Sequence, residues 1–234
     1  NSMFKDKKIV VIIPAFNEEN AVGKVIQDIP TDIVDEVIVV NNNSTDRTSE
    51  SALKEGATVL FEERKGYGNA CLKGMEYVEN EMETPPDILI FIDADYSDYP
   101  EQMPELIQPI ASGEAQLVIG SRAIGKRDAG SMTVPQLFGN WLATRLIRLL
   151  YGIHFTDLGP FRAIDYPAIK TLDMQDKTYG WTVEMQVKAA KYELKCKEVP
   201  VNYRQRIGFS KISGTVKGTL MAGYKIITTI FKYL

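Results

Sequence analysis

An apolar run that ends in two aspartates constrains the fold of this chain more than any other stretch. Residues 88–92, Ile-Leu-Ile-Phe-Ile, are followed directly by Asp93-Ala94-Asp95. Five consecutive apolar residues are too few to span a bilayer, and their β-branched and aromatic side chains favour a buried strand of a parallel sheet. Open α/β sheets bind ligands beyond the carboxyl ends of such strands. The sequence therefore predicts two carboxylates at a ligand-binding edge.

Two interpretations of Asp93 and Asp95 are open at this point. The pair can hold a diphosphate through a hard divalent cation, which removes the repulsion between like charges. The pair can also cap the turn that follows the strand, because Asp-x-Asp is a short and common pattern. The context of the two residues has to decide.

Short apolar runs alternate with helical stripes through the first 120 residues. Between the runs, apolar residues recur at i, i+3, i+4 and i+7, the spacing of a helix packed on a sheet. The predicted strands span residues 8–13, 36–40, 58–61, 88–92 and 117–120. This alternation predicts an α/β fold with a doubly wound, Rossmann-like, mostly parallel sheet and helices on both faces. Loops after the strands would place Glu18, Asn41 and Arg122 beside the two aspartates.

Two loops of this half have recognisable chemistry. The turn 41–46 contains Ser44 and Asp46, which can cap the helix after it. The basic loop 64–69 contains two glycines and opens another helix, so its backbone can approach a phosphate closely. Its spacing matches neither the dinucleotide-binding nor the phosphate-loop motif, so alone it is a weak signal.

The second half of the chain departs from this rhythm. It is predicted to contain helices at 138–151, 181–191 and 215–234, a strand at 195–201 and a polar loop at 203–214. The charged loop 125–130, flanked by glycines, is a candidate lid. Glu184 precedes Lys188 by four residues on a helix, which favours an ion pair over a role as general base.

Two of these helices have apolar stripes. The stripe of the first consists of Phe138, Leu142, Leu146, Leu149 and Leu150. The broad apolar face of segment 215–234 consists of Val216, Leu220, Ile227, Ile230 and Leu234, opposite Lys217, Lys225, Thr228 and Lys232. This amphipathic pattern is typical of a helix at a membrane interface, but a helix docked on its own core has the same pattern. Both interpretations stay open.

The composition is that of a folded protein. Hydrophobic residues make up 44% and charged residues 25% of the 234 residues, which excludes wholesale disorder and suffices for one α/β domain with appendages. Two separated cysteines and a single histidine cannot build a zinc site, and we expect reduced cysteines in a cytoplasmic protein. The sequence contains no signal peptide and no apolar run of about 18 residues.

The net charge of −4 hides an asymmetry along the chain. Residues 1–120 contain 9 Lys and Arg against 23 Asp and Glu, and residues 121–234 contain 18 against 8. A nucleic-acid-binding protein would be more uniformly basic, so we expect no nucleic-acid partner. The basic half is suited to anionic groups.

Seven short motifs now stand in a fixed order. They are Ile-Pro-Ala-Phe-Asn-Glu (13–18), Asn-Ser-Thr-Asp (43–46), Lys-Gly-Tyr-Gly (65–68), Asp-Ala-Asp (93–95), Gly-Ser-Arg (120–122), Gly-Pro-Phe-Arg-Ala (159–163) and Arg-Ile-Gly-Phe-Ser-Lys (206–211). Together they resemble the inverting GT-A glycosyltransferases, in particular the polyprenyl-phosphate (dolichyl-phosphate-type) glucosyl- and mannosyltransferases. The resemblance implies a GT-A domain over 3–214, with a donor half at about 8–122 and an acceptor half at 123–214, followed by the amphipathic helix 215–234.

The resemblance also implies roles for individual residues. Asp93 and Asp95 would be the metal pair for Mg²⁺ or Mn²⁺, with Asp95 the direct ligand. The implied donor-binding residues are Pro14, Ala15, Glu18, Asn41, Asp46, Lys65, Asp93, Ala94 and Asp95. The implied acceptor-binding residues are Arg122, Gln136, Asn140, Arg206 and Ser210. The implied catalytic residues are Asp95, Arg122, Asp157, Arg206 and Lys211.

The chain departs from the family pattern in two places. Relatives commonly have an aspartate for the base where this chain has Asn41 and Asn42, and an amide can donate as well as accept. Gln136 and Asn140 stand near the positions where relatives place arginine and serine. Asp157 can orient a phosphate-binding arginine such as Arg162, or cap its own turn.

The predicted reaction is metal-dependent, inverting transfer of a hexose from a nucleotide-diphosphate sugar, with UDP-glucose favoured, to polyprenyl phosphate. A phosphate acceptor is already anionic near pH 7 and needs cations rather than a base. The enzyme would be peripheral on the cytoplasmic face of the membrane, docked through helices 138–151 and 215–234. The alternatives are a soluble or protein hydroxyl acceptor, with Glu184 or Asp157 as base, and a non-catalytic nucleotide-binding module.

Overall fold

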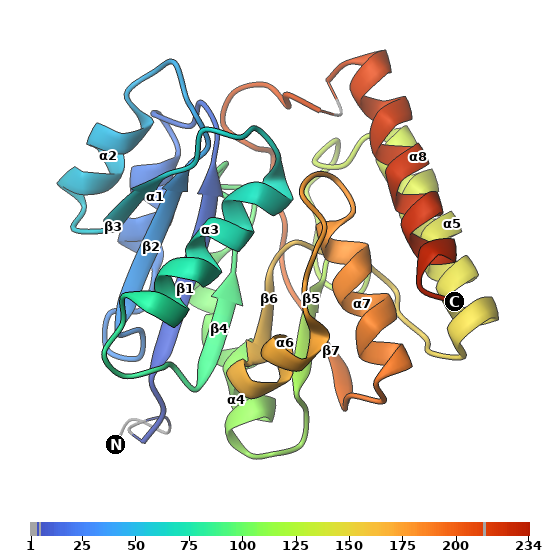
Figure 1. The fold of residues 1–234 in the computed structure, drawn as a ribbon. Coiled ribbons are helices and arrows are strands. Elements are labelled where there is room, and N and C mark those ends of the chain that lie inside the picture. The colour runs from blue at the N-terminus through green and yellow to red at the C-terminus, as the bar shows by residue number, and fades with distance from the viewer. Residues whose placement is uncertain (1–3, 5, 213) are drawn as a thin grey trace.

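The computed structural model of the chain describes residues 4, 6–212 and 214–234. Met3, the first residue of the predicted region 3–214, and Ser213, in the predicted polar loop, lie outside the described residues. Within the described residues, seven strands form one sheet in the order β3-β2-β1-β4-β6-β5-β7 (Figure 1). Their bounds are β1 Ile9–Ala15, β2 Glu36–Asn41, β3 Thr58–Phe61, β4 Ile88–Phe91, β5 Leu117–Ser121, β6 Arg162–Asp165 and β7 Cys196–Pro200.

The sheet is mostly parallel, as predicted. Strand β1 pairs in parallel with β2 and β4, β2 with β3, and β5 with β7. Every residue of β1 and β4 is buried, which explains why these strands are continuous apolar runs rather than alternating ones. Strand β6 lies antiparallel between β4 and β5, and this insertion separates two strands that are successive in the first half of the chain.

Helices cover both faces of the sheet. Beneath α1 (Val22–Asp28), α2 (Thr48–Lys54) and α4 (Met103–Ala111), one apolar cluster includes Val25 and Leu106. On the other face, a second cluster includes Cys71 and Trp181. The helices of that face are α3 (Tyr67–Asn80), α5 (Val134–Tyr151), α6 (Tyr166–Leu172), α7 (Trp181–Lys191) and α8 (Val216–Lys232). A short 3₁₀ helix, Pro100–Gln102, precedes α4.

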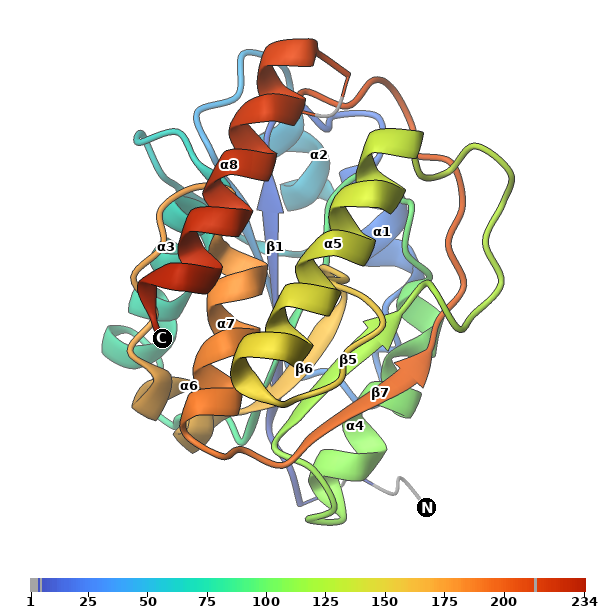
Figure 2. The same ribbon diagram turned by 90° about the vertical axis from the view of Figure 1, so that its right-hand side faces the viewer.

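Helices α5 and α8 lie side by side on the outside of this second layer (Figure 2). The predicted stripe of α5 is only partly correct, because Ala143, Thr144 and Ile147 are its buried residues, while Phe138 and Leu149 are exposed. Leu146 and Leu150 of the stripe pack partly against the core beside Ile147, whereas Phe138 and Leu149 lie on the outer side. The helix therefore presents apolar surface to its surroundings.

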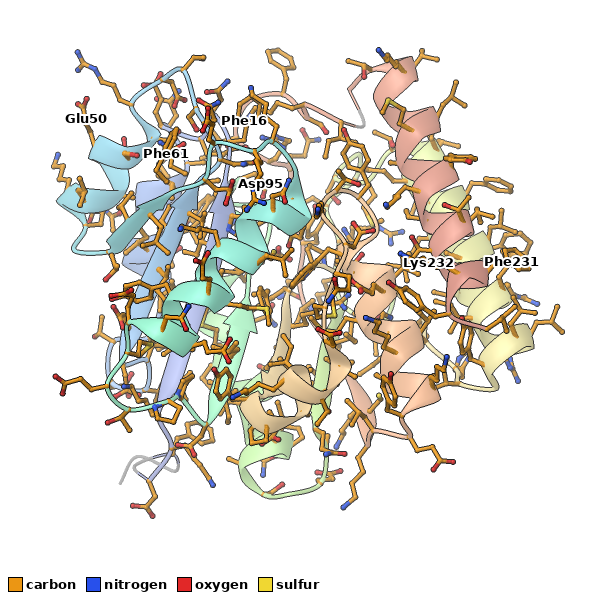
Figure 3. All side chains as sticks on the ribbon, viewed as in Figure 1. Phe16, Glu50, Phe61, Asp95, Phe231 and Lys232 are labelled. Atoms are coloured by element: carbon orange, nitrogen blue, oxygen red, sulfur yellow. The ribbon has the colours of Figure 1, made fainter. Side chains whose placement is uncertain are left out.

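Helix α8 has one face docked on the protein core and another that exposes apolar side chains, so each of the two predicted interpretations describes one face. Thr229 and Ile230 are buried against the protein, and the Tyr151 hydroxyl donates to the Ile230 carbonyl. The outer face presents exposed apolar side chains, with Val216 at 80% and Tyr224 at 74% exposure, and Figure 3 shows Phe231 pointing away from the sheet. The predicted apolar face is therefore divided, since Ile230 packs inward. Within the described residues, none of the helices has the length and apolar character needed to cross a bilayer.

Candidate active site

The two aspartates lie where β4 leaves the sheet, and Figure 3 shows Asp95 at the same edge as Phe16. Asp95 accepts hydrogen bonds through Oδ1 from the backbone nitrogen of Ser97 at 3.0 Å and from its hydroxyl at 2.5 Å. Its Oδ2 faces Nη1 of Arg206 at 3.3 Å. One oxygen of Asp95 is thus fixed by its own turn, and the other is directed at a cation.

Asp93 is the less satisfied of the pair. Its Oδ1 is buried and has no hydrogen-bond partner among the described residues. Burial, together with the neighbouring Asp95 carboxylate, raises the pKa of Asp93 to about 7. An orphaned carboxylate oxygen beside a second carboxylate is a donor set that suits a hard divalent cation such as Mg²⁺ or Mn²⁺.

Two carboxylates are a small ligand set. No third His, Cys, Asp or Glu joins them in a metal-binding group within residues 4, 6–212 and 214–234. Mg²⁺ commonly binds through one or two carboxylates, with substrate phosphates and water completing its shell. The residues present therefore fit a cation that arrives with a diphosphate.

A cavity of about 270 Å³, the smaller cavity, opens beside this pair. Of the predicted donor-binding residues, it is lined by Pro14, Ala15, Glu18, Lys65, Asp93, Ala94 and Asp95. Residues without a predicted donor role also line it, among them Phe16, Asn42 and Tyr179. The Lys65 ammonium lies 4.1 Å from the centre of the Phe16 ring. Phe16 lies inside the first motif, 13–18, so the sequence could have identified it as a further residue of this site.

Asn41 and Asp46 do not line either cavity described here. The Asn41 amide donates to Ser49 Oγ at 2.6 Å and its oxygen accepts from the Ser44 nitrogen. Neither Ser44 nor Asp46 is the N-cap of α2, which is Arg47 without a side-chain cap; Asp46 accepts from the backbone nitrogen of Thr48, and Ser44 accepts from the backbone nitrogen of Asn17. Asn41 and Asp46 therefore stabilise the loop, and Asn42 lines the smaller cavity instead of Asn41.

A second cavity of about 560 Å³, the larger cavity, meets the smaller one at Asp93, Asp95 and Arg206. All five predicted acceptor-binding residues line it: Arg122, Gln136, Asn140, Arg206 and Ser210. Among the described residues in its lining, Asp93 and Asp95 are the only acidic side chains. The larger cavity thus joins the aspartate pair to two arginines from the second half of the chain.

Arg122 is held by a buried ion pair with Asp157. The guanidinium donates to both carboxylate oxygens, at 2.9 and 2.8 Å, and the Arg122 backbone nitrogen donates at 2.8 Å. Burial alone would lower the pKa of Arg122, but the Asp157 carboxylate raises it above the ordinary value. The guanidinium also lies 4.9 Å from the centre of the Tyr203 ring. Asp157 is therefore a positioning residue for Arg122.

Arg162, which Asp157 was predicted to orient, has a different role. Its fully buried guanidinium donates to the carbonyls of Leu158, Gly159 and Thr182 and to the side chain of Gln186. Burial lowers the pKa of Arg162 to about 10. Arg162 thus supports the turn behind the cavity and takes no place in its lining.

The polar loop 203–214 carries cations across the site. Arg206 pairs with Glu18 as well as with Asp95, and the Lys211 ammonium contacts Glu18 Oε1 at 2.8 Å and the Asn17 carbonyl at 2.8 Å. The backbone nitrogen of Ile207 donates to the Asp95 carbonyl. The cationic loop is thus attached to the aspartate turn by both backbone and side chains.

The candidate lid 125–130 is paired with this same loop. Asp128 and Tyr203 donate backbone hydrogen bonds to the carbonyls of Tyr203 and Lys126, each at 2.9 Å. The Gln205 amide donates to the Ala129 carbonyl at 3.0 Å. The two loops are therefore joined by hydrogen bonds, and Gly130 at the end of the candidate lid lines the larger cavity; a lid motion stays a prediction.

Glu184 is a structural residue. It is fully buried and pairs with Lys188 at 2.8 Å. It also accepts from the backbone nitrogens of Gln175 and Asp176 and from the Tyr233 hydroxyl. The predicted ion pair is confirmed, and Glu184 lines neither cavity.

Comparison with protein families gives a match for most of the chain. Residues 10–172 match the family described as Glycosyl transferase family 2. The matched region contains the aspartate pair, Arg122 and Asp157. The cationic loop 203–214 and helix α8 lie outside it.

Similar sequences extend over nearly the whole chain. An uncharacterized protein of Methanocaldococcus jannaschii is 30% identical, over 97% of this chain and 92% of its own length. An undecaprenyl-phosphate mannosyltransferase of Micrococcus luteus is 29% identical, over 90% of each chain. A UDP-N-acetylglucosamine–dolichyl-phosphate N-acetylglucosaminyltransferase of Methanococcus voltae is also 29% identical, over 94% of each.

A solved structure has the same fold. Glucosyl-3-phosphoglycerate synthase from Mycobacterium tuberculosis, in complex with Mn²⁺, UDP-glucose and phosphoglyceric acid, superposes with a TM-score of 0.75. The match covers 99% of this chain and 81% of that one, at 23% identity. The likeness establishes a shared GT-A architecture.

Proposed function

Since this chain belongs to glycosyl transferase family 2, and is therefore an enzyme that transfers a sugar, we propose that it moves a hexose from a UDP-linked donor, preferably UDP-glucose, to polyprenyl phosphate. The transfer would invert the configuration at the anomeric carbon. The two similar transferases named for polyprenyl-type phosphate acceptors support this substrate class.

The single observation that carries the proposal is the composition of the larger cavity. It contains Arg122 and Arg206, and its only acids among the described residues are the two aspartates of the metal pair. Transfer to a hydroxyl requires a general base, whereas a phosphate acceptor is already mostly dianionic at neutral pH. Asp157 and Glu184, the bases named in the rival hypothesis, are both committed to buried ion pairs.

On the donor side, Asp93 and Asp95 would hold Mg²⁺ or Mn²⁺ together with the diphosphate of the sugar nucleotide. The cation, when bound, would neutralise charge on the departing diphosphate. Lys65 and Lys211 line the smaller cavity and add positive charge toward the same group. The Mn²⁺ and UDP-glucose in the structurally similar synthase are consistent with this arrangement.

On the acceptor side, Arg122 and Arg206 would bind the phosphate. Asp157 fixes the Arg122 guanidinium in one orientation, which reduces the conformational freedom lost on binding. Because the two cavities share Asp95 and Arg206, an acceptor phosphate in the larger cavity would lie next to a donor in the smaller one. An in-line displacement with inversion would require a phosphate oxygen to approach the anomeric carbon from the side opposite to the departing diphosphate.

We also propose that the enzyme is peripheral on the cytoplasmic face of the membrane. The outer sides of α5 and α8 expose Val134, Phe138, Leu220 and Tyr224 on one layer of the molecule. Exposed apolar surface of this kind, beside basic residues, is typical of binding to an anionic lipid interface. Tyr224→Glu should reduce sedimentation with anionic liposomes, whereas Leu53→Glu on α2 should not; equal binding by both variants would contradict this assignment.

The function is tested by incubating the full chain with radiolabelled UDP-glucose, UDP-N-acetylglucosamine or GDP-mannose, Mn²⁺ or Mg²⁺, and undecaprenyl phosphate in detergent micelles. Label should enter the organic phase, and both EDTA and Asp95→Asn should abolish its transfer. Absence of lipid-linked sugar with every donor would contradict the proposal.

A phosphorylated soluble acceptor is the second candidate. It is favoured by the phosphoglyceric acid bound in the structurally similar synthase. In the same assay, 3-phosphoglycerate replaces the lipid. Label in an anionic, water-soluble product would then identify this class of acceptor instead.

A further inference from the structure

The segment 173–180 connects α6 to α7 and reaches the smaller cavity. Tyr179 of this segment lines that cavity, and so do Gly66 and Tyr67 of the basic loop 64–69. All residues of the segment are described, and none of them belongs to a helix or strand. The position of Tyr179 therefore depends on the contacts that hold the segment.

On one side, the backbone of the segment lies directly against the basic loop. The Asn69 backbone nitrogen donates to the Lys177 carbonyl at 2.9 Å. A Cβ atom built on Gly66 would clash with the carbonyl oxygen of Lys177. A Cβ atom built on Gly68 would clash in the same way with that of Asp176. Because only glycine permits two backbones to approach so closely, a shift of the segment would also shift the basic loop.

Asp176 holds the segment together from within. Its carboxylate accepts through Oδ1 from the backbone nitrogens of Thr178 at 2.8 Å and Gly180 at 3.0 Å. Its Oδ2 pairs with the Lys225 ammonium of α8 at 3.1 Å. The Asp176 side chain is only 6% exposed, and a carboxylate buried to this degree needs both hydrogen bonds and a counter-charge.

On the other side, helix α8 packs closely around this ion pair. A Cβ atom built on Gly180 would lie 2.5 Å from Oδ2 of Asp176 and 2.7 Å from Oγ1 of Thr229. Thr229 is one of the buried residues of α8. The segment is thus enclosed between α8 and the basic loop, and neither Asp176 nor Lys225 lines a cavity described here.

We propose that Asp176, through its ion pair with Lys225, is a positioning residue for the donor nucleotide. The pair fixes the segment, and the segment in turn supports the basic loop and places Tyr179 in the smaller cavity. This inference rests on the proposed function, because it takes the smaller cavity as the donor site. It adds that α8, which lies outside the matched family region, contributes to donor binding through a residue that does not contact the donor.

The test measures UDP binding to the full chain by calorimetry in the presence of Mn²⁺. Asp176→Asn retains an acceptor oxygen for the two backbone nitrogens and loses the charge, whereas Lys225→Gln leaves Asp176 itself intact. Each should weaken UDP binding about threefold, since the Lys225 side chain is 38% exposed and solvent screens the pair. Lys225→Arg preserves the charge and should retain the affinity of the wild type.

Two further variants separate the ion pair from general effects of charge. Lys217→Gln removes the same charge from an exposed position of the same helix and should leave UDP affinity unchanged. Combining Asp176→Asn with Lys225→Gln should weaken binding no more than either change alone, because both act through one contact. Unchanged affinity in Lys225→Gln, an equal loss in Lys217→Gln or additive losses in the double variant would each overturn the inference.

Kinetics distinguish positioning from a purely structural role. In the transfer assay, Lys225→Gln should raise KM for the UDP-sugar by the same factor and leave kcat unchanged. A lower kcat with an unchanged KM would indicate a smaller fraction of folded enzyme and would overturn the inference.

The inference and the function on which it rests can fail separately. The predicted losses of UDP affinity, found without sugar transfer to any polyprenyl phosphate, would refute the proposed acceptor and leave the role of Asp176 standing. Transfer to polyprenyl phosphate with unchanged UDP binding in both single variants would do the reverse. A wild-type protein that binds no UDP in the presence of Mn²⁺ would overturn both.

Discussion

Replacing Arg206 with glutamine should strengthen Mn²⁺ binding in the absence of nucleotide. Arg206 Nη1 lies 3.3 Å from Asp95 Oδ2, on the carboxylate that we assign to the metal. A divalent cation that binds this oxygen must therefore displace a guanidinium. Removing the competing cation should favour the metal, although Arg206 is itself proposed to assist the reaction.

The size of this effect follows from the geometry of the pair. Two unit charges 3.3 Å apart interact by ~5 kcal/mol at an effective dielectric constant of ~20 and by ~1 kcal/mol in bulk water. The side chains of Arg206 and Asp95 are 23% and 11% exposed, and Arg206 keeps its contact with Glu18 when it leaves Asp95. Both facts bring the net cost toward the lower value, ~1 kcal/mol, or roughly fivefold in affinity.

The assay follows free Mn²⁺ by electron paramagnetic resonance during titration of the full chain. Lys211→Gln is the matched control, because it removes the same charge from the same cavity but contacts Glu18 and Asn17 rather than Asp95. The control should change Mn²⁺ affinity less than twofold. In the presence of Mn²⁺, Arg206→Gln should weaken UDP binding, so the two ligands should respond in opposite directions.

Two results would refute this reasoning. Unchanged or weaker Mn²⁺ binding in Arg206→Gln would mean that the guanidinium does not compete for the metal position. An equal gain in Lys211→Gln would mean that the effect comes from general electrostatics rather than from the contact with Asp95.

Three further predictions concern the buried charges. Mn²⁺ affinity should rise roughly tenfold from pH 6 to pH 8, through the pKa of Asp93 at about 7, because the metal requires the ionised carboxylate. Asp93→Asn should remove this pH dependence in the same titration. Asp157→Asn should destabilise the fold by ~3 kcal/mol in urea denaturation, because it leaves the Arg122 guanidinium buried without its carboxylate, and should raise KM for the acceptor. Glu184→Gln should cost a similar amount of stability, since Lys188 loses its buried partner, but it should leave kcat of the folded enzyme unchanged. If Glu184 were the general base, the same variant would lose most of its kcat.

Local sequence patterns were sufficient for most of the elements. Continuous apolar runs located β1 and β4 because both strands are buried on two faces, and the helical spacing located α7 at the predicted bounds. The place of β6 between β4 and β5 could not be predicted in the same way. Four residues of strand pattern do not specify their neighbours, because register and order depend on tertiary packing.

The candidate site was likewise predictable only in part. The resemblance to a known family brought the five acceptor-binding residues into one list, and the structure brings them into one cavity. The pairing of Arg122 with Asp157 spans 35 residues, and no local pattern specifies it. Asn41 and Asn42 differ by one position, yet only Asn42 lines the smaller cavity. Successive side chains at a strand end point to opposite sides, so a motif cannot decide between them.

The charge asymmetry along the chain is visible at this site. Glu18 and Asp95 come from the acidic first half, and Arg206 and Lys211 from the basic second half; the four side chains form one connected group of ion pairs. Cation and diphosphate must separate these partners in order to bind, so part of the binding free energy is spent on ion pairs that already exist. On the proposed function, a bound cation and diphosphate would displace Arg206 from Asp95, and Arg206 would become available to an anionic acceptor. Acceptor affinity should therefore increase once the donor is bound, which predicts a sequential order of binding with the donor before the acceptor; equal acceptor affinity with and without Mn²⁺ and UDP would contradict this order.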